Sequence, residues 1–511
     1  MEDVGEDFET SNQQSNDGTS DAVGDDQLAA IGDDQLAAIG DQLAAGFGDE
    51  EYYNPNKDTQ SGPTVVPEHA IQINYNERQK PIIISGSGWS TLKVPPPIFK
   101  VDKEAYVPKI VSIGPFHHNE PSLRAMQTEK RRFLNRLVQN QTGQLIHEES
   151  LKNAMRELEE KTRKFYANDF QTIEPDEFVQ MMLLDGCFIV ELLRFYEKNR
   201  EGEPLFKTRW MQTNISRDLI LLENQLPMFV LQKIFELTPS LMGEATLNTL
   251  ALRFFEPLRP GKEKFEEGTL NKHANSEYIH LLALFHSSLI SGDKTYPQQP
   301  TKSEKEKTHL RLPGKGWVHN AKTLSYAGIK FQGKSSCILD IQLTGKTLKI
   351  STMVIDDSTS PVLRNLIAYE QNNCDVTPYF CCLALFLDSI VDTVEDVKIL
   401  CNAEIIKHAM GRDEEVANLF NRLTKELVFD INEEYCYMTK EIENINRHCR
   451  MHDIRVRIRR FLARLNYKGS LNTIFYILVT IILSFIASNP PNDSPSSTNG
   501  LSPTPPPPPS L

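Results

Sequence analysis

The sequence predicts a mainly α protein: a helix-rich globular domain with a small antiparallel β element, followed by a C-terminal transmembrane helix. Three observations predict this class. Apolar residues recur at helical spacing through much of residues 90–468, the segment 335–355 alternates apolar and polar residues as strands do, and residues 471–488 carry no charge. Two further regions are expected, an acidic tail at 1–75 and a Pro-rich tail at 489–511.

The expected acidic tail holds most of the charge of the chain. Residues 1–60 contain sixteen Asp and Glu against one Lys, a net charge of -15, whereas the whole chain has a formal charge of -14. The rest is therefore nearly neutral, which argues against a protein that binds nucleic acid. The tail repeats GDDQLAAI twice and then GDQLAA, a period that fits no amphipathic helix. Its composition predicts disorder, with a short docking helix that uses Leu28, Leu36 and Leu43 as the alternative.

Helical spacing places the first helix of the globular domain at residues 121–137, with Pro121 and Ser122 as start signals. Residues 176–196 are apolar on almost every side, which predicts a central, buried helix. Residues 218–235 begin as another helix, which Pro227 must kink or restart because proline has no amide hydrogen. Further helical patterns lie at 377–401, 404–411, 413–428 and 434–465, and surface loops are expected at 256–275 and 291–316.

The segment 335–355 is the expected β element. Ile338, Asp340 and Gln342 alternate before a turn that contains Gly, and Leu348 and Ile350 alternate after it. This pattern predicts a small hairpin.

Directly before that hairpin, GIKFQGKS at 328–335 matches the phosphate-binding loop pattern G-x-x-x-x-G-K-S. Such a loop needs a buried strand before it and a helix starting at its Lys, so that backbone amides point at phosphate. Here the preceding residues HNAKTLSYA have helical character, and the following residues alternate like a strand. We therefore interpret the segment as a turn and strand entrance with Lys334 at a solvated edge. The residues rejected as a nucleotide site are Gly328, Gly333, Lys334 and Ser335.

The uncharged residues 471–488 are expected to cross a membrane. Eighteen residues of helix span about 27 Å, near the lower limit for a bilayer. Six basic residues precede the segment, whereas no Lys or Arg follows it, so the positive-inside bias places the large domain in the cytosol. The basic residues are Arg455, Arg457, Arg459, Arg460, Arg464 and Lys468. A buried terminal helix of a soluble protein is the alternative.

Two clusters of histidine and cysteine suggest metal ligands and are interpreted as structural instead. His117 and His118 are adjacent, so they do not readily ligate one ion from one helix face, and His448, Cys449 and His452 have no visible second ligand pair. The eight cysteines form no C-x-x-C pair, which is typical of a reduced cytosolic protein, and the N-terminus shows no secretory signal. We expect no metal and no cofactor.

Four carboxylates lie in apolar helical patterns, where burial would raise the pKa and make general acid catalysis conceivable. They are Asp185, Glu191, Glu223 and Glu370. A buried carboxylate more often has a structural partner, such as an Arg or a helix N-terminus. The sequence contains no G-x-S-x-G or H-E-x-x-H motif, so no catalytic residue is assigned.

Six stretches occur in an order that is specific to one plant family. They are VPKIVSIGPFHHNEPSLRAMQTEKRRFL (107–134), MMLLDGCFIVELL (181–193), DLILLENQLPMFVL (218–231), VLRNLIAYEQ (362–371), FLDSIVDTVEDVKIL (386–400) and GRDEEVANLFNRL (411–423). Over roughly residues 90–490 the chain resembles the proteins that carry domain of unknown function 247. The resemblance implies a largely helical protein that ends in one hydrophobic segment, with no established catalytic activity. Some grass members are implicated in self-incompatibility, which implies a recognition module.

Together these observations predict a single-pass membrane protein of a plant, in the plasma membrane or an endomembrane. We expect it to act by binding an unknown protein partner, and we expect no nucleotide and no nucleic acid among its ligands. The first alternative is an enzyme with an unrecognised helical active site that uses Asp185 or Glu223. The second is a soluble protein whose last helix is buried.

Overall fold

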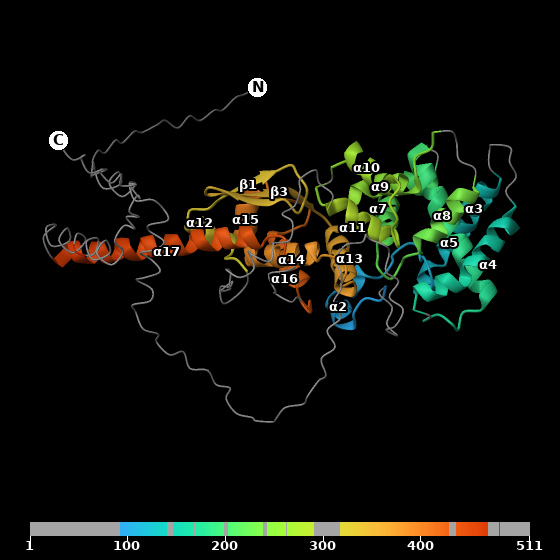
Figure 1. The fold of residues 1–511 in the computed structure, drawn as a ribbon, viewed down its shortest axis with the longest axis horizontal. Helices are drawn as coiled ribbons and strands as arrows, with labels where there is room; N and C mark the ends of the chain where they lie inside the picture. The colour runs from blue at the N-terminus through green and yellow to red at the C-terminus, as the bar shows by residue number, and fades with distance from the viewer. Residues whose placement is uncertain are drawn as a thin grey trace, which may run out of the picture. The chain divides into compact units, whose positions relative to one another are not determined.

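The structure of the chain is a computed structural model. It describes residues 92–139, 147–167, 169–198, 203–238, 243–261, 263–290, 317–428, 436–468 and 480. Contacts divide the chain into a body, Asn56–Cys449, and a second unit made of Met1–Pro55 and Arg450–Leu511. The fold of the body is described here, and it is helix-rich, as predicted (Figure 1).

In the described residues of the first half of the body, the regular elements are helices. The predicted central helix is confirmed as α5, Pro175–Lys198, which packs against α3, α4, α8 and α9. Fifteen of its residues are buried, because its apolar side chains surround the whole helix. The helices of this half are α2 (Pro96–Val101), α3 (Ala125–Val138), α4 (Glu148–Phe165), α5, α6 (Pro204–Lys207), α7 (Arg209–Asp218), α8 (Met228–Leu237), α9 (Leu247–Phe255), α10 (Glu267–Ala274) and α11 (Leu281–Ile290), with short 3-10 turns at Lys103–Ala105, Pro121–Leu123 and Glu256–Leu258.

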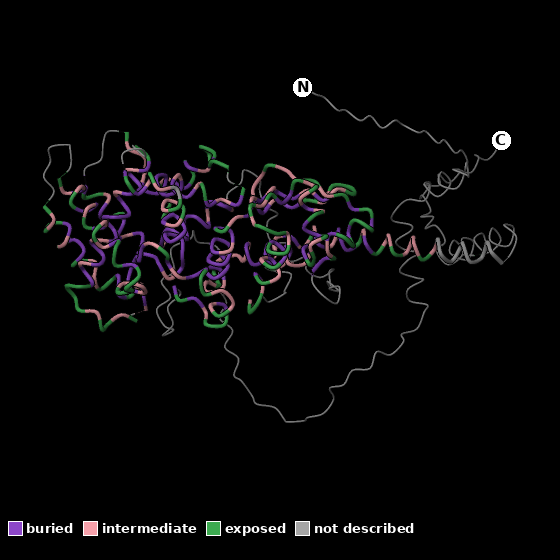
Figure 2. The backbone as a smooth tube through the Cα atoms, turned by 180° about the vertical axis from the view of Figure 1, so that it is seen from behind, coloured by how far each residue is buried: buried purple, intermediate pink, exposed green. Residues whose placement is uncertain are grey.

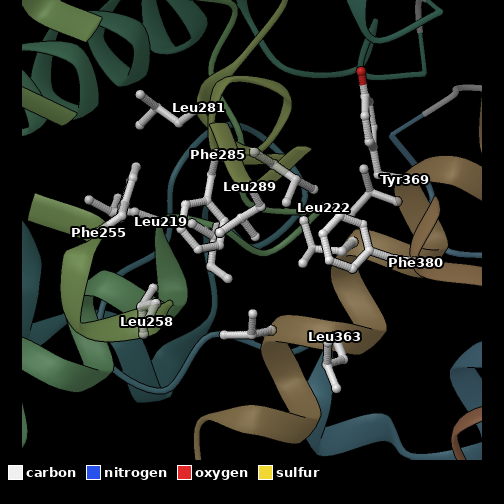
Figure 3. Close-up of a cluster of buried hydrophobic side chains, with 14 of the residues drawn as sticks. Leu219, Leu222, Phe255, Leu258, Leu281, Phe285, Leu289, Leu363, Tyr369 and Phe380 are labelled. Atoms are coloured by element: carbon white, nitrogen blue, oxygen red, sulfur yellow. The ribbon is translucent and has the colours of Figure 1, made fainter. Parts of the chain in front are cut away.

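The second half of the body combines helices with two small sheets. Its helices are α12 (Ala321–Tyr326), α13 (Thr359–Asn372), α14 (Tyr379–Ile390), α15 (Val394–Asn402), α16 (Asp413–Leu423) and the start of α17 (Thr439–Lys468). Helix α13 contacts α11 of the first half and α14 of the second. Leucine and aromatic side chains from these helices and from the chain after α7 form a common core (Figure 3). Figure 2 shows buried residues distributed through the interior of both halves.

The predicted hairpin is confirmed, but the β element is not purely antiparallel. Strands β2 (Ile341–Thr344) and β3 (Thr347–Ser351) pair antiparallel around Gly345, which has a positive φ of 60°. Strand β1 (Lys330–Lys334) adds to the other side of β3 in parallel, with Lys330 opposite Thr347. A second sheet pairs β4 (Met353–Ile355) with β5 (Ile406–His408), also in parallel. The first sheet is therefore mixed and the second is parallel. Helices α13 to α15 lie between β4 and β5 in the chain and provide the crossover that this parallel pair needs.

Three predictions about single elements are wrong. Residues 404–411 contain β5 instead of a helix, because Glu404 has a positive φ of 57° after α15 and Met353 then donates its amide to Ile405 (2.8 Å). The region 256–275 contains α10 as well as loop. The helix expected at 218–235 does not form before Pro227, because α7 ends at Asp218 and residues 219–227 are not helical. The predicted restart at Pro227 is confirmed, since Pro227 directly precedes α8.

Several predicted regions lie outside the residues that the structure describes. These are the acidic tail at 1–75, the loop at 291–316, the membrane segment at 471–488 apart from Thr480, and the Pro-rich tail at 489–511. Within the described ranges, no helix combines the length and the apolar character needed to cross a bilayer. The predicted transmembrane helix therefore stays a prediction.

Candidate functional site

Six buried polar side chains of the body gather where two segments without regular structure meet, and we call them the polar cluster. Each is at most 2% exposed: Lys130, Asp185, Asp218, Asn224, Gln225 and Asn365. The two segments are residues 107–114, before the second 3-10 turn, and residues 219–227, between α7 and α8. Buried polar groups require partners, because an unpaired one costs about 1–3 kcal/mol. The partners of these six side chains show what the cluster does.

Asp218, the last residue of α7, holds the backbone of the segment 107–114. Its carboxylate accepts the amide hydrogens of Lys109 (3.0 Å), Ile110 (2.6 Å) and Val111 (3.0 Å), and Arg217 Nη1 donates to it at 2.8 Å. Burial raises the pKa of Asp218, while Arg217 and the three amides oppose that rise. Three backbone amides thus donate to one carboxylate. This fixes the loop in place, as the hydrogen bonds of a sheet fix a strand.

Asn224 and Gln225 explain why the chain after α7 leaves the helical conformation. Asn224 Oδ1 accepts the amide hydrogen of Ile113 (2.6 Å), and Asn224 Nδ2 donates to the carbonyls of Val111 (3.0 Å) and Asp218 (2.8 Å). Gln225 Nε2 donates to the carbonyl of Leu219 at 2.9 Å. These side chains satisfy backbone groups that would otherwise pair within a helix, so the apolar sequence forms a buried loop.

The same loop is fixed from two other helices. Gln225 Oε1 accepts the amide hydrogen of Leu282 in α11 (3.1 Å). Asn365 in α13 accepts the amide hydrogen of Leu222 (2.8 Å) and donates to the carbonyl of Ala105 (2.8 Å). The loop therefore connects α7, α11 and α13 through side chains that bond to backbone.

Asp185 and Lys130 form the ionic part of the cluster. Lys130 Nζ lies 2.5 Å from Asp185 Oδ1 and 2.6 Å from the carbonyl oxygen of Ser112, and the amide of Gly114 donates to Asp185 Oδ2 at 2.9 Å. Gly114 has a positive φ of 71°, and a Cβ there would lie 2.7 Å from the carbonyl oxygen of Gln225. Only glycine fits this close approach without strain. Asp185, nominated as a general acid, therefore has a charged partner and a backbone donor.

Glu370, another nominated carboxylate, belongs to α13, and its side chain reaches the first turn of α14. It accepts the amide hydrogens of Phe380 (2.9 Å) and Cys381 (2.8 Å), and His286 Nε2 lies 2.8 Å from its Oε1. A Glu–His pair is one arrangement used for general base catalysis. Here His286 is only 3% exposed and Glu370 only 5%, so the pair is enclosed in the core. The carboxylate satisfies amides of the first turn of α14 and benefits from the positive end of the helix dipole.

The remaining two nominated carboxylates are less enclosed. Glu223 accepts the amide hydrogen of Val94 at 2.8 Å, and burial raises the pKa of Glu223 while this amide opposes the rise. Burial also raises the pKa of Glu191, and Arg194 and Arg136 oppose that rise. The structure thus brings Asp185 and Glu223 to backbone amides of the segments before α3, rather than to each other.

The nominated histidines and cysteine do not converge. His118 Nε2 lies 3.4 Å from Glu177, and burial lowers the pKa of His117. His448 Nε2 lies 3.1 Å from the carbonyl oxygen of Ala327. His452 Nδ1 lies 3.8 Å from its neighbour Asp453. Over the part of the chain that the structure describes, no three His, Cys, Asp or Glu residues are placed to hold a metal ion.

The phosphate-loop match has a structural account for each of its residues. Gly328 follows α12 with a φ of 87°, and the strand β1 runs through Gly333 and ends at Lys334, where a phosphate loop would start a helix. Lys334 Nζ lies 2.9 Å from Asp340, and the Lys334 side chain is 19% exposed. Lys334 is therefore more enclosed than the solvated position that the sequence predicts. Ser335 Oγ donates to Glu263. The expected turn and strand entrance is confirmed.

Sequence reasoning missed Asp218, Asn224, Gln225 and Asn365. The signal was present, because the stretch DLILLENQLP places Asp, Asn and Gln inside an otherwise apolar run that ends at Pro227. Polar residues at positions that a helix pattern would bury indicate a loop whose backbone they satisfy. Asn224 bonds to Ile113 and Asn365 to Leu222, both more than 100 residues away, so spacing alone does not identify these partners.

The sequence of the chain matches a family model and is similar to two known proteins. A family model described as plant protein of unknown function, DUF247, matches residues 92–486. The chain is similar to the UPF0481 protein At3g47200 of Arabidopsis thaliana, with 30% identity over 67% of this chain and 74% of that protein. It is also similar to the putative UPF0481 protein At3g02645 of the same plant, with 22% identity over 70% of this chain and 82% of that protein. No solved structure matches the chain.

Proposed function

The chain belongs to the plant protein family DUF247, and we propose that it is a membrane-anchored recognition module that acts by binding another protein. The proposal is supported by the contacts of the carboxylates that were candidates for catalysis. Asp185 and Glu370 are buried, and both accept hydrogen bonds from backbone amides. Groups that hold the backbone in this way stabilise a scaffold, and a rigid scaffold is what a binding surface requires.

The anchoring part of the proposal rests on the C-terminal sequence. Helix α17 ends at Lys468, three residues before the uncharged segment 471–488. Basic residues precede that segment and none follow it, which favours a cytosolic body by the positive-inside bias.

A candidate contact residue for the partner is Trp210 in α7. Its side chain is 57% exposed, although tryptophan is a residue that proteins commonly bury or use in interfaces. Helix α7 ends at Arg217 and Asp218, which bond to backbone of the segment before α3. The helix thus presents Trp210 from a fixed position, which reduces the entropy cost of binding.

The topology test uses the full chain with a fluorescent protein fused to its C-terminus, expressed in plant microsomes. Added protease should leave the tag intact until detergent opens the vesicles, while the body is digested. Digestion of the tag without detergent would contradict the membrane anchor. Recovery of the full chain in the soluble fraction would favour a soluble protein with a buried terminal helix.

The recognition test places a photoreactive phenylalanine analogue at position 210 of the full chain in the same membranes. Irradiation should give one discrete adduct with a second protein, because a contact residue lies within reach of its partner. A matched probe at Glu236, an exposed residue of α8, should give no such adduct. Equal patterns from the two positions would contradict the role of Trp210, and the absence of adducts from further exposed positions would contradict recognition itself.

A further inference from the structure

Two cysteine side chains of the body lie in direct contact although 54 positions separate them. Cys382 belongs to the first turn of α14 and is fully buried, and Cys436 is half-buried and precedes α17 by three residues. Their thiols hydrogen-bond to each other. All eight cysteines of the chain are free thiols in this structure.

Neighbouring contacts hold the two thiols in place. The ring of Tyr379, the first residue of α14, and the ring of Tyr437, which follows Cys436, have centroids 5.4 Å apart. Thr439 Oγ1 donates to the carbonyl oxygen of Cys436 at 2.8 Å, which fixes the backbone as it enters α17. The thiol contact therefore forms between the first turn of α14 and a backbone position that is fixed by Thr439.

The two thiols differ in chemistry. The hydrogen bond from Cys382 lowers the pKa of Cys436, burial opposes this, and the amide of Met438 lowers it further. The same thiol contact raises the pKa of Cys382, and burial raises it too. Cys436 is also the more accessible of the two thiols, since it is half-buried whereas Cys382 is fully buried, so an oxidant from solvent reaches Cys436 first.

We propose that Cys436 and Cys382 form a reversible disulfide when the protein meets hydrogen peroxide, with Cys436 as the first sulfur to react. The Cys436 thiolate attacks one peroxide oxygen, the S–O bond forms, the O–O bond breaks, and the leaving hydroxide takes a proton to become water. The sulfur is oxidised to a sulfenic acid and the peroxide is reduced. Cys382 then loses its proton and attacks that sulfur, the S–S bond forms, the S–O bond breaks, and a second water leaves. A dithiol reverses the reaction by thiol–disulfide exchange.

The disulfide would join α14 to the backbone that leads into α17. It would also close a loop that contains α15, β5 and α16, which lie between the two cysteines. A crosslink of this kind limits the unfolded chain, so the oxidised body should be more stable than the reduced body.

The test treats the full-length protein in detergent micelles with a small excess of hydrogen peroxide and identifies disulfide-linked peptides by mass spectrometry without reduction. A Cys382–Cys436 peptide should appear and should disappear after addition of dithiothreitol. Cys401 is the matched control, because it is also half-buried whereas burial raises its pKa. Cys436 should oxidise faster than Cys401, because the hydrogen bond from Cys382 lowers the pKa of Cys436 whereas burial raises the pKa of Cys401.

Two variants separate the steps. In Cys382→Ala the sulfenic acid at Cys436 should persist and be trapped by dimedone, whereas in Cys436→Ser the thiol of Cys382 should stay reduced. Thermal unfolding of both variants checks that the fold is retained, and the half-buried Cys436→Ser is the less disruptive of the two. The proposal is overturned if Cys401 or the exposed Cys374 oxidises as fast as Cys436, or if Cys436 pairs with another cysteine.

Discussion

At the scale of single residues, side chains of this protein satisfy buried backbone groups that helices and sheets would satisfy with backbone hydrogen bonds. Asp218 satisfies three consecutive amides of a segment about 110 positions earlier in the chain. Asn224 bonds to both a donor and an acceptor of the same segment. Removing such a group leaves buried amides without partners, at a cost of about 1–3 kcal/mol each.

His280 is a buried residue whose titration should be visible in stability. It is 1% exposed, its Nδ1 accepts the amide hydrogen of Ala283 at 3.0 Å, and burial, with a smaller effect of His286, lowers its pKa from 6.5 to about 3. Below pH 6.5 the unfolded state therefore binds a proton that the folded state does not bind. The free energy of unfolding should fall by about 1.4 kcal/mol per pH unit from this residue, between about pH 6 and pH 4.

The measurement is denaturant unfolding at several pH values for wild type and His280→Asn. Asparagine keeps an acceptor for Ala283 but does not titrate. The free energy of unfolding of the variant should therefore fall less steeply on acidification, and the difference in slope should correspond to about one proton. His319→Asn, the same change at an exposed histidine, is the control. Identical slopes for wild type and His280→Asn would show that His280 takes up its proton in the folded state.

At the scale of elements, the sequence predicts those whose pattern is local. Helix α5 is recognised because its own residues are apolar on all sides, and the β2–β3 hairpin because alternation flanks a Gly turn. Strand β5 is missed because its three residues pair with β4, about 50 positions earlier. The loop at 219–227 is missed for the same reason, because its polar partners belong to distant segments.

Gly333 in β1 tests the structural account of the phosphate-loop match. Its amide donates to the carbonyl oxygen of Ala403 at 2.7 Å, and a Cβ there would lie 2.4 Å from the carbonyl oxygen of Glu404. Gly333→Ala should therefore push β1 away from this backbone and lower the free energy of unfolding by about 1–3 kcal/mol. Gly268→Ala in α10, where a Cβ meets nothing within 4 Å, should be neutral or slightly stabilising.

Calorimetric or denaturant unfolding of the two variants gives the comparison. Equal effects of the two changes would contradict the close approach at Gly333. Binding of ATP or GTP that Lys334→Ala abolishes would restore the nucleotide interpretation that we reject.

At the scale of the whole body, the polar cluster joins parts of the chain that are far apart in sequence. Gly114, Lys130 and Asp185 meet through one ion pair and one amide, and Asn365 connects Ala105 to Leu222. Because these contacts join segments that are far apart in sequence, we expect the body to unfold cooperatively. The sequence predicts the family and the helical class, but it does not predict this cluster, since each partner is chosen by the tertiary fold.

We propose that the buried ion pair of Asp185 and Lys130 serves the stability of the body. The most direct measurement is the free energy of unfolding of Asp185→Asn, with the exposed Asp176→Asn as control. Loss of one partner leaves Lys130 buried and unpaired, so we expect a loss of about 3–5 kcal/mol, against less than about 0.5 kcal/mol for the control. Adding Lys130→Met to Asp185→Asn should recover part of the loss, because the buried charge is then gone. Unchanged stability of Asp185→Asn together with loss of a cellular function would contradict the claim and assign Asp185 to an active site.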